Sequence, residues 1–127
     1  MRGLLDSHTF LWWDSSSSRL SSPVRSFLTN PANDVLLSVV SVWEILIKLR
    51  LGKLAVRAPL PTILTQQQSR GIQILPVTLD HVMAVGTLPA AHKDPFDRLL
   101  IAQANVEGAV LLSADPVFAQ YPVQVLW

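Results

Sequence analysis

The sequence predicts an α/β fold, specifically a three-layer α/β/α sandwich around a central, mostly parallel sheet of four to five strands. Short apolar runs alternate with longer segments that carry helix start and stop signals. The runs are apolar throughout rather than alternating with polar residues, as expected for strands that are covered on both faces. Half of the residues are hydrophobic and only 15% are charged, so much of the chain must be buried. No repeat or composition shift divides the sequence, and we expect one domain over residues 1–127.

Each expected strand is a short apolar run that ends at a polar residue, a proline or a glycine. These runs cover residues 2–5, 34–38, 72–77, 110–113 and 123–127, the last as an edge strand. Between them, helical segments are expected over residues 7–13, 22–30, 41–51, 59–70, from 78 or 80 to 85, and 94–107. Strands and helices alternate along the chain, which is the pattern of a parallel sheet with crossover helices.

Helix boundaries follow from capping residues. Ser22 is expected to cap the second helix with Pro23 at its first position, and Ser41 and Glu44 have the spacing of a capping box. Asp94 followed by a proline predicts the start of the 94–107 helix, and Gly108 predicts its end. A final helical turn is expected to begin after an aspartate at 115. The short helix near residue 80 is expected to place His81 toward solvent, beside an aspartate.

Charge and composition exclude several function classes. The net charge of +1 gives no overall field of the kind that attracts nucleic acid non-specifically, so a nucleic-acid partner must be bound locally. The absence of cysteine excludes disulfides, zinc–thiolate sites and thiol catalysis. Asp6 interrupts the start of the chain before any signal-peptide apolar region, and no run reaches the roughly 18 apolar residues of a membrane helix. We therefore expect a soluble cytoplasmic protein with no membrane partner.

Acidic residues follow the expected strands or begin the expected helices. Because the carboxyl ends of parallel strands meet at one edge of a sheet, Asp6, Glu44 and Asp115 are expected at that edge, together with the helix start that carries Asp97. Taken singly, each has a structural alternative: Asp6, Asp94 and Asp115 as helix caps, and Glu44 as half of a capping box or an ion pair with Lys48.

Taken together, the acids predict a metal site. Converging carboxylates would repel one another and retain protons unless a cation neutralised them. Oxygen ligands in this number suit Mg²⁺, with Mn²⁺ as a substitute. Glu44 adds to this interpretation because its sequence neighbours are apolar, and a buried carboxylate without a partner is costly.

At this point the sequence resembles PIN domains. The four acidic motifs of that family are matched by Asp6 after the first strand, Ser41-Val-Trp-Glu44, Asp97-Arg-Leu-Leu-Ile-Ala102 and Leu112-Ser-Ala-Asp115-Pro-Val-Phe118. More narrowly, the sequence resembles VapC-type toxins of toxin–antitoxin pairs. The stretches that carry this resemblance are Leu4-Leu-Asp-Ser-His-Thr-Phe-Leu-Trp-Trp13, Trp43-Glu-Ile through Leu51-Gly-Lys-Leu54, His92-Lys-Asp-Pro-Phe-Asp-Arg98 and Leu126-Trp127. The resemblance spans essentially the whole chain, and its specificity comes from the four motifs occurring together.

The resemblance implies a PIN-like fold and a metal-dependent endoribonuclease that acts as the toxin of a toxin–antitoxin pair. Its metal-binding and catalytic acids map onto Asp6, Glu44, Asp97 and Asp115. Asp94 is expected to cap its helix and support the site, and it stays a second candidate ligand. Ser113 matches a small hydroxyl residue that the family keeps near its last acid, and Ser7 takes the place of a common threonine. The family also forms homodimers and is silenced by an antitoxin protein.

Cations close to the acids are the candidate RNA contacts: Lys48, Arg50, Lys53, Lys93 and Arg98. Helix C-terminal charge and solvated surface explain such residues equally well. These cations are not interleaved with aromatic side chains, so the sequence does not predict a preference for particular bases.

Two other function classes stay open at the level of sequence. One is a catalytically inactive PIN-like module that binds RNA or protein, against which the presence of all four acids argues. The other is a receiver-like Mg²⁺-binding signalling domain, which would need paired acids at the first strand and a lysine after the last core strand. The sequence has neither feature.

Overall fold

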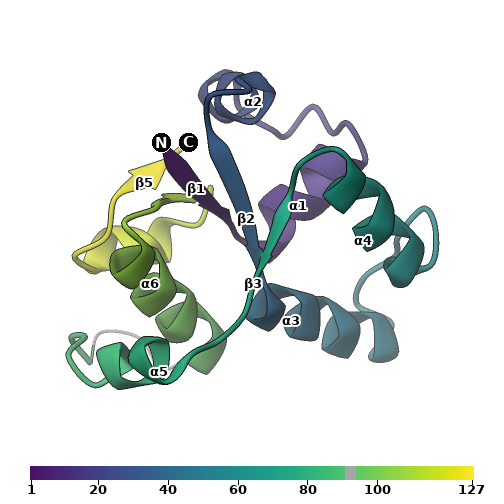
Figure 1. Ribbon diagram of the computed structural model, residues 1–127. Coiled ribbons are helices and arrows are strands. Elements are labelled where there is room, and N and C mark those ends of the chain that lie inside the picture. Colours follow the sequence, from purple (N-terminus) through teal and green to yellow (C-terminus); the bar gives the residue numbers. More distant parts are fainter. Residues whose placement is uncertain (91–93) are drawn as a thin grey trace.

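A computed structural model of the protein describes residues 1–90 and 94–127. Its five strands form one sheet in the order β3-β2-β1-β4-β5, and every neighbouring pair is parallel (Figure 1). The strands are β1 (Arg2–Leu5), β2 (Asp34–Ser38), β3 (Gln73–Leu75), β4 (Val110–Leu112) and β5 (Val125–Leu126). The expected parallel sheet is confirmed with five strands, although β3 and β5 are shorter than the apolar runs that predicted them.

The helices of the described chain connect these strands in the expected order. They are α1 (Ser7–Asp14), α2 (Ser22–Thr29), α3 (Val39–Arg50), α4 (Leu60–Ser69), α5 (Leu79–Val85), α6 (Pro95–Glu107) and the 3₁₀ helix η1 (Pro116–Gln120). None of the helices in the described ranges is long and apolar enough to span a lipid bilayer.

Helices cover both faces of the sheet and enclose two apolar clusters, which confirms the three-layer sandwich. On one face Leu5, Leu37 and Leu112 pack with the α1, α2 and α4 side chains. On the other face Leu4, Leu36 and Leu111 pack with α6 and η1. Consecutive strand residues point to opposite faces, so each central strand supplies one leucine to each cluster. Figure 1 shows α5 and α6 on one side of the sheet and α1 and α4 on the other.

The three central strands end in the same pattern of two leucines and one polar residue. The register pairs Leu5 of β1 with Leu37 of β2 and with Leu112 of β4. The next residues along these strands are Asp6, Ser38 and Ser113, which are all nearly inaccessible to solvent. The sheet therefore aligns one carboxylate and two hydroxyls at its carboxyl edge.

The close approach of α2 to β1 depends on Gly3. A Cβ at this position would lie 2.4 Å from Cε1 of Phe27, much closer than van der Waals contact allows. Glycine leaves room for the buried phenyl ring of Phe27 directly on the strand backbone.

Helix α2 is capped by Ser21, whose side chain accepts from the Val24 N–H, so the expected cap at Ser22 was one residue too late.

Helix α3 begins three residues earlier than the sequence suggested. Its cap is Ser38, whose Oγ accepts from the Val40 N–H, so the capping box expected for Ser41 and Glu44 is wrong. Glu44 consequently lies more than one turn inside the helix, and its carboxylate is available for tertiary contacts. The α6 boundaries are confirmed: Asp94 caps the helix, and Gly108 ends it in the left-handed conformation.

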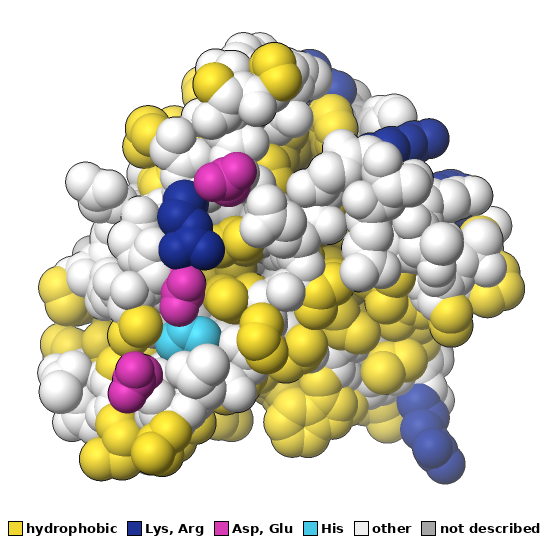
Figure 2. All heavy atoms as spheres, in the orientation of Figure 1, with side chains coloured by type: hydrophobic (Ala, Val, Ile, Leu, Met, Phe, Trp, Pro, Cys, Tyr) yellow, Lys and Arg dark blue, Asp and Glu magenta, His cyan; other side chains and the backbone are white. Residues whose placement is uncertain are grey.

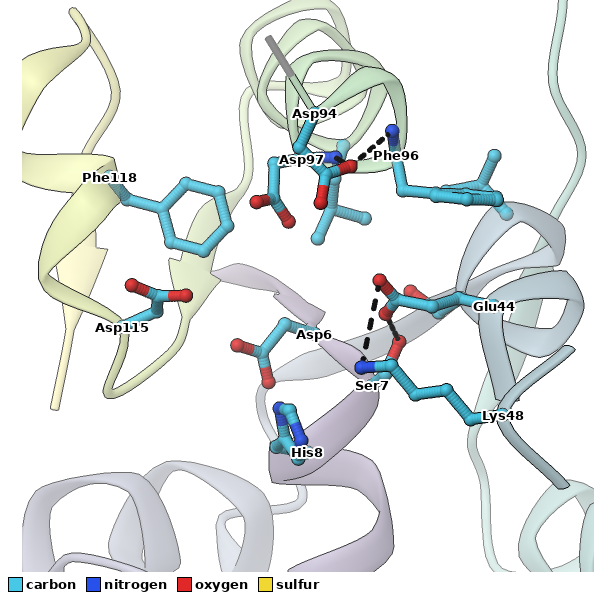
Figure 3. Close-up of a pocket in the computed structure, with 13 residues that line it drawn as sticks. Asp6, Ser7, His8, Glu44, Lys48, Asp94, Phe96, Asp97, Asp115 and Phe118 are labelled. Carbon is cyan, nitrogen blue, oxygen red and sulfur yellow. Dashed lines mark hydrogen bonds and ion pairs between the residues drawn. The ribbon is translucent and has the colours of Figure 1, made fainter. Parts of the chain in front are cut away.

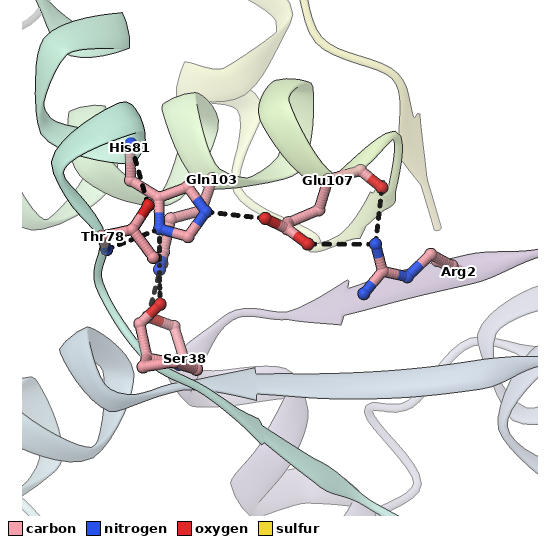
Figure 4. Close-up of polar contacts among 7 residues, drawn as sticks. Arg2, Ser38, Thr78, His81, Gln103 and Glu107 are labelled. Carbon is pink, nitrogen blue, oxygen red and sulfur yellow. Dashed lines mark hydrogen bonds and ion pairs between the residues drawn. The ribbon is translucent and has the colours of Figure 1, made fainter.

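A polar network joins α5 and α6 to the sheet (Figure 4). His81 is fully buried in it, so the expectation that this side chain faces solvent is wrong. The Thr78 N–H donates to His81 Nδ1 at 3.0 Å, which leaves Nε2 to donate to Glu107 at 2.8 Å. Arg2 donates to the same carboxylate at 3.0 Å. Figure 2 shows acidic and basic side chains and a histidine in a line across this face, among apolar side chains.

The network continues from the histidine to β2. Gln103 on α6 accepts from Ser38 Oγ at 2.5 Å, and its amide nitrogen lies 3.3 Å from His81 Nδ1. Because Ser38 also caps α3, one connected set of hydrogen bonds positions the beginning of α3 relative to α6. These are the two helices that bring acidic side chains to the candidate site.

Candidate metal centre

A pocket of about 110 Å³ opens at the carboxyl edge of the sheet, where β1 ends and α3, α6 and η1 begin (Figure 3). Its lining residues are Asp6, Ser7, His8, Val40, Ser41, Glu44, Lys48, Asp94, Phe96, Asp97, Leu100, Asp115 and Phe118. The lining includes five carboxylates that come from four separate parts of the sequence. All four acids expected at this edge, together with Asp94, therefore face one pocket.

Asp6 is held by hydrogen bonds on both of its carboxylate oxygens. Oδ1 accepts from the Thr9 N–H at 2.8 Å, which caps α1, and Oδ2 accepts from Ser113 Oγ at 2.5 Å. The side chain is largely buried, with 8% exposure. The structural alternative and the site assignment are thus compatible, because the residue that caps α1 also lines the pocket.

Glu44 reaches the pocket from the second turn of α3. Ser7 Oγ donates a short hydrogen bond to its Oε1, and Lys48 Nζ lies 3.9 Å from its Oε2. The ion pair with Lys48 that the sequence offered as an alternative is present. Ser7 lies directly after Asp6, so the end of β1 supplies one acid and the hydroxyl that orients a second.

The first turn of α6 supplies two further acids. Asp94 Oδ1 accepts from the Phe96 N–H at 2.9 Å and the Asp97 N–H at 3.3 Å, as an N-cap does. Oxygens of Glu44, Asp94 and Asp97 lie within 4.8 Å of one another, so these three side chains could ligate one ion. The positive end of the helix dipole also favours negative charge at this position.

Asp115 approaches from the opposite side of the pocket (Figure 3). Its Oδ1 accepts from the Val117 N–H at 3.0 Å and caps η1. The Asp115 N–H donates to Ser113 Oγ at 3.1 Å, and the same hydroxyl donates to Asp6. Ser113 therefore connects the two acids through its hydroxyl.

The donor set fits a hard divalent cation. The acids that group closely enough to share an ion are all carboxylates, with hydroxyls beside them, and such oxygen donors suit Mg²⁺ and Mn²⁺ rather than softer metals, although the imidazole of His8 also lines the pocket. The closest grouping of three acids consists of Glu44, Asp94 and Asp97. Asp6 and Asp115 line the remainder of the same pocket, so they would contact the cation or a substrate held beside it.

Of the cations expected to contact RNA, some lie at the acidic pocket and others lie elsewhere in the fold. Lys48 lines the pocket, whereas Arg50 and Lys53 are exposed at the far end of α3 and are not among the described residues that line it. The Arg98 guanidinium donates to the carbonyl of Pro89 at 2.6 Å and approaches Tyr121 Oη at 3.3 Å, away from the acids. Consecutive helical residues point about 100° apart, which explains why Asp97 faces the pocket and its neighbour does not. The expected contact at Lys93 lies outside the described residues.

Two aromatic side chains that were not among the candidate site residues also line the acidic pocket. His8 is exposed on the first turn of α1, next to Asp6, and Phe96 lies on the first turn of α6. The signal for His8 was its position two residues after a strand-terminal acid. For Phe96 it was its place between two acids at a helix start.

The fold is similar to that of several solved toxin–antitoxin structures. A chain in the crystal structure of VapBC2 from Rickettsia felis, bound to a DNA fragment from their promoter, matches with a TM-score of 0.71 and 15% identity, over 100% of this chain and 98% of that chain. A chain of DNA-bound VapBC from Salmonella typhimurium matches with a TM-score of 0.67 and 13% identity, over 100% and 97%. A toxin–antitoxin complex from Klebsiella pneumoniae contains a match with a TM-score of 0.65 and 16% identity, over 98% and 96%.

At these identities the structural matches establish the fold. No curated protein sequence matches the chain. The sequence family is shown by a separate comparison, in which the family model of the PIN domain matches residues 3–124, nearly the full length. With its parallel sheet and its acids gathered at the carboxyl edge, the chain belongs to the PIN domain family.

Proposed function

We propose that the protein is a metal-dependent endoribonuclease and the toxin of a toxin–antitoxin pair. The observation that carries this proposal is the convergence of five carboxylates on one pocket, with three of them close enough to share an ion. Membership of the PIN domain family supports nuclease activity, and the fold similarity to chains of VapBC complexes supports the biological role.

In this proposal Asp6, Glu44, Asp97 and Asp115 hold Mg²⁺, with Mn²⁺ as a substitute, and Asp94, whose oxygen lies close to those of Glu44 and Asp97, is a further candidate ligand. A divalent cation supplies charge neutralisation for a phosphodiester and acidity for an attacking water. The chain's own residues provide the geometry. Ser7 and Ser113 fix the orientation of Glu44 and Asp6 through their hydroxyls. Phe118 and Leu100 add apolar side chains to the lining of the pocket.

Lys48 is the candidate substrate contact inside the pocket. Its ammonium lies beside Glu44, where it could meet a phosphate oxygen of an RNA strand that approaches the acids. Arg50, Lys53 and Lys93 stay candidates for contacts further along the strand. Arg98 is a weaker candidate because backbone carbonyls occupy its guanidinium.

Exposed apolar side chains on α3 and α5 are consistent with binding to other proteins, which in this proposal are an antitoxin and a second copy of the chain. On these two helices, the apolar side chains with about half or more of their surface exposed are Trp43, Leu46, Leu79, Val82 and Met83. Apolar surface of this kind is typical of protein-interaction sites. The proposal places the protein in the cytoplasm, where RNA substrates and an antitoxin are present.

The proposal is tested by cleavage of RNA with purified protein. We expect cleavage with Mg²⁺ or Mn²⁺ and none in EDTA. The variant Asp97→Asn should lower the rate by more than about a hundredfold while keeping the fold, because even outer partners of metal ligands are worth about 10- to 100-fold. Asp80→Asn, which removes an exposed acid on α5, is the matched control and should leave the rate unchanged.

Cleavage that persists in EDTA, or in the folded Asp97→Asn protein, would contradict the proposal. RNA binding by the wild-type protein without any cleavage would instead favour the inactive binding module. Circular dichroism of each variant separates a lost activity from a lost fold.

A further inference from the structure

A second cavity adjoins the acidic pocket on the side of α1. It has a volume of about 280 Å³ and is lined by Asp6, His8, Trp12, Arg19, Ala114 and Asp115. Asp6, His8 and Asp115 also line the acidic pocket. The two hollows are therefore neighbours that share part of their walls, and a ligand large enough to fill both would cross the carboxylates.

The wall that the acidic pocket does not share is aromatic and cationic. Trp12 lies one turn after His8 on α1, and their ring centroids are 5.9 Å apart. The guanidinium carbon of Arg19 lies 6.0 Å from the centroid of the Trp12 ring. His8 and Arg19 are exposed, whereas Trp12 is half-buried. Two aromatic rings and one planar cation thus meet at a surface that solvent reaches.

The indole is held in place from behind. Trp12 packs against the apolar cluster on the α1 side of the sheet, and its ring centroid lies 5.6 Å from that of Trp127. A ring fixed in this way loses little conformational freedom when a ligand packs on it, which favours binding.

These groups have the chemistry of a base-stacking site. Aromatic side chains stack on nucleobases with little regard to sequence, and arginine adds cation–π and phosphate contacts. An occupant that reaches both hollows needs a phosphate at the carboxylate end and a planar ring at the other end. A nucleotide has both features, and an apolar protein segment lacks the phosphate.

We propose that this cavity binds the nucleobase next to the scissile phosphate, with His8, Trp12 and Arg19 as its binding residues. The proposal rests on the proposed nuclease function and deepens it, because it specifies a single-stranded RNA substrate with an unpaired base beside the cut. The aromatic wall lies beside Arg19 rather than beside the cations that the sequence singled out. Arg19 was not among the candidate contacts from the sequence.

The test measures binding in the Asp97→Asn background, which should bind RNA without cutting it, in the presence of Mg²⁺. The probes are a fluorescein-labelled single-stranded RNA octamer and an octamer of the same length with abasic ribose-phosphate units. We expect the RNA to bind about tenfold more tightly than the abasic strand, which lies within the range that one stacked base contributes. His8→Ala and Arg19→Gln, combined, should reduce that ratio several-fold, with Trp12 left to provide the remaining preference.

Controls separate the possible outcomes. Arg70→Gln removes an exposed arginine outside both hollows and should preserve the ratio. Arg19→Lys retains the charge without the planar group and should reduce the ratio only in part. Both His8 and Arg19 are exposed, so the substitutions should leave folding intact.

Equal affinity of the Asp97→Asn protein for the RNA and the abasic strand would contradict the proposed base-binding site. An unchanged affinity ratio in the protein that also carries His8→Ala and Arg19→Gln would contradict it too, and this result is expected if a protein segment occupies the cavity. Neither result affects the nuclease proposal as long as the wild-type protein cleaves RNA with Mg²⁺. If the wild-type protein cleaves no RNA and the Asp97→Asn protein binds neither strand, the nuclease proposal and the base-binding proposal both fail.

Discussion

Asp6 and Asp115 combine a structural contact with a position in the acidic pocket. Each caps the helix that follows it, and each faces the same hollow. Ser113 lies between them, with its hydroxyl donating to Asp6 and accepting from the Asp115 N–H. For these residues, structural and catalytic interpretations of the sequence were not alternatives, because the N–H groups of a helix start and a metal ion both favour a carboxylate.

The Ser7 hydroxyl is expected to matter for activity more than for stability. Ser7→Ala removes the donor that orients Glu44, so the rate of RNA cleavage should fall about tenfold, as for other outer partners of metal ligands. The unfolding free energy should fall by about 1 kcal/mol, the usual value of one such hydrogen bond. Ser7→Thr keeps the hydroxyl and should retain most of the activity.

Cleavage kinetics and urea denaturation of the two variants check this prediction. A wild-type rate in a folded Ser7→Ala protein would show that the contact with Glu44 is unimportant for the reaction.

At the scale of residues, the sequence located the acids better than the cations. Asp6, Glu44, Asp97 and Asp115 could be placed together because parallel strands end at one edge. The direction of Arg98 could not be predicted in the same way, because it depends on the carbonyls of Val85 and Pro89 in another segment. Such contacts leave no local pattern in the sequence.

At the scale of elements, α6 is held at both ends by different chemistry. Its first turn is capped by Asp94 and faces the acidic pocket, and its last turn carries Glu107 in the network with Arg2 and His81. The cap was predictable from the Asp-Pro pair, since both residues favour a helix start. The buried position of His81 was not, because the apolar residues of α5 at helical spacing, Leu79, Val82 and Met83, lie on its exposed face, and the buried face carries the histidine.

Two substitutions at Asp94 separate its cap from its charge. Asparagine caps helices as well as aspartate, so Asp94→Asn should keep the unfolding free energy within about 0.5 kcal/mol, whereas Asp94→Ala should lose about 1 kcal/mol. Because Asp94 offers an oxygen close to those of Glu44 and Asp97, Asp94→Asn should still raise the Mg²⁺ concentration for half-maximal cleavage about tenfold.

Metal titrations of cleavage and denaturant titrations of both variants provide the measurement. An unaltered Mg²⁺ dependence in Asp94→Asn, together with a destabilised Asp94→Ala, would restrict this residue to capping.

At the scale of the whole molecule, the polar network links the sheet to α5 and α6 and makes stability depend on pH. The hydrogen bond from His81 lowers the pKa of Glu107 below its ordinary value of 4.5, and Arg2 acts in the same direction against the effect of burial. A carboxyl group with a lowered pKa in the folded state stabilises the fold above the pKa of the unfolded chain. That contribution is lost as the pH falls from about 4.5 through the lower, folded-state value.

We therefore expect Glu107→Gln to reduce the loss of stability between pH 5 and pH 3. Guanidinium unfolding of the wild type and the variant across this range provides the measurement, with the exposed acid of Asp80→Asn as the control. Parallel stability curves for the wild type and Glu107→Gln would contradict the assigned coupling.

The layers and the strand directions of the fold could be predicted from the sequence, because continuous apolar runs between helices are typical of covered parallel sheets. The start of α3 could not, because Ser38 and Ser41 are both suitable caps. The register of β2 against β3 decides between them: Ser38 still pairs with Leu75 of β3, and the helix begins at the next residue. Boundaries of this kind depend on contacts between segments far apart in the chain.

The leucine–leucine–polar ends of β1, β2 and β4 have a consequence for folding fidelity. A shift of one strand by one residue exchanges its two faces, yet leucine would still meet leucine, so apolar contacts alone discriminate poorly against the error. The shift would, however, carry Asp6, Ser38 or Ser113 out of alignment and separate them from their partners at the sheet edge. The same three polar residues therefore take part both in the contacts at the sheet edge and in the alignment of the strands.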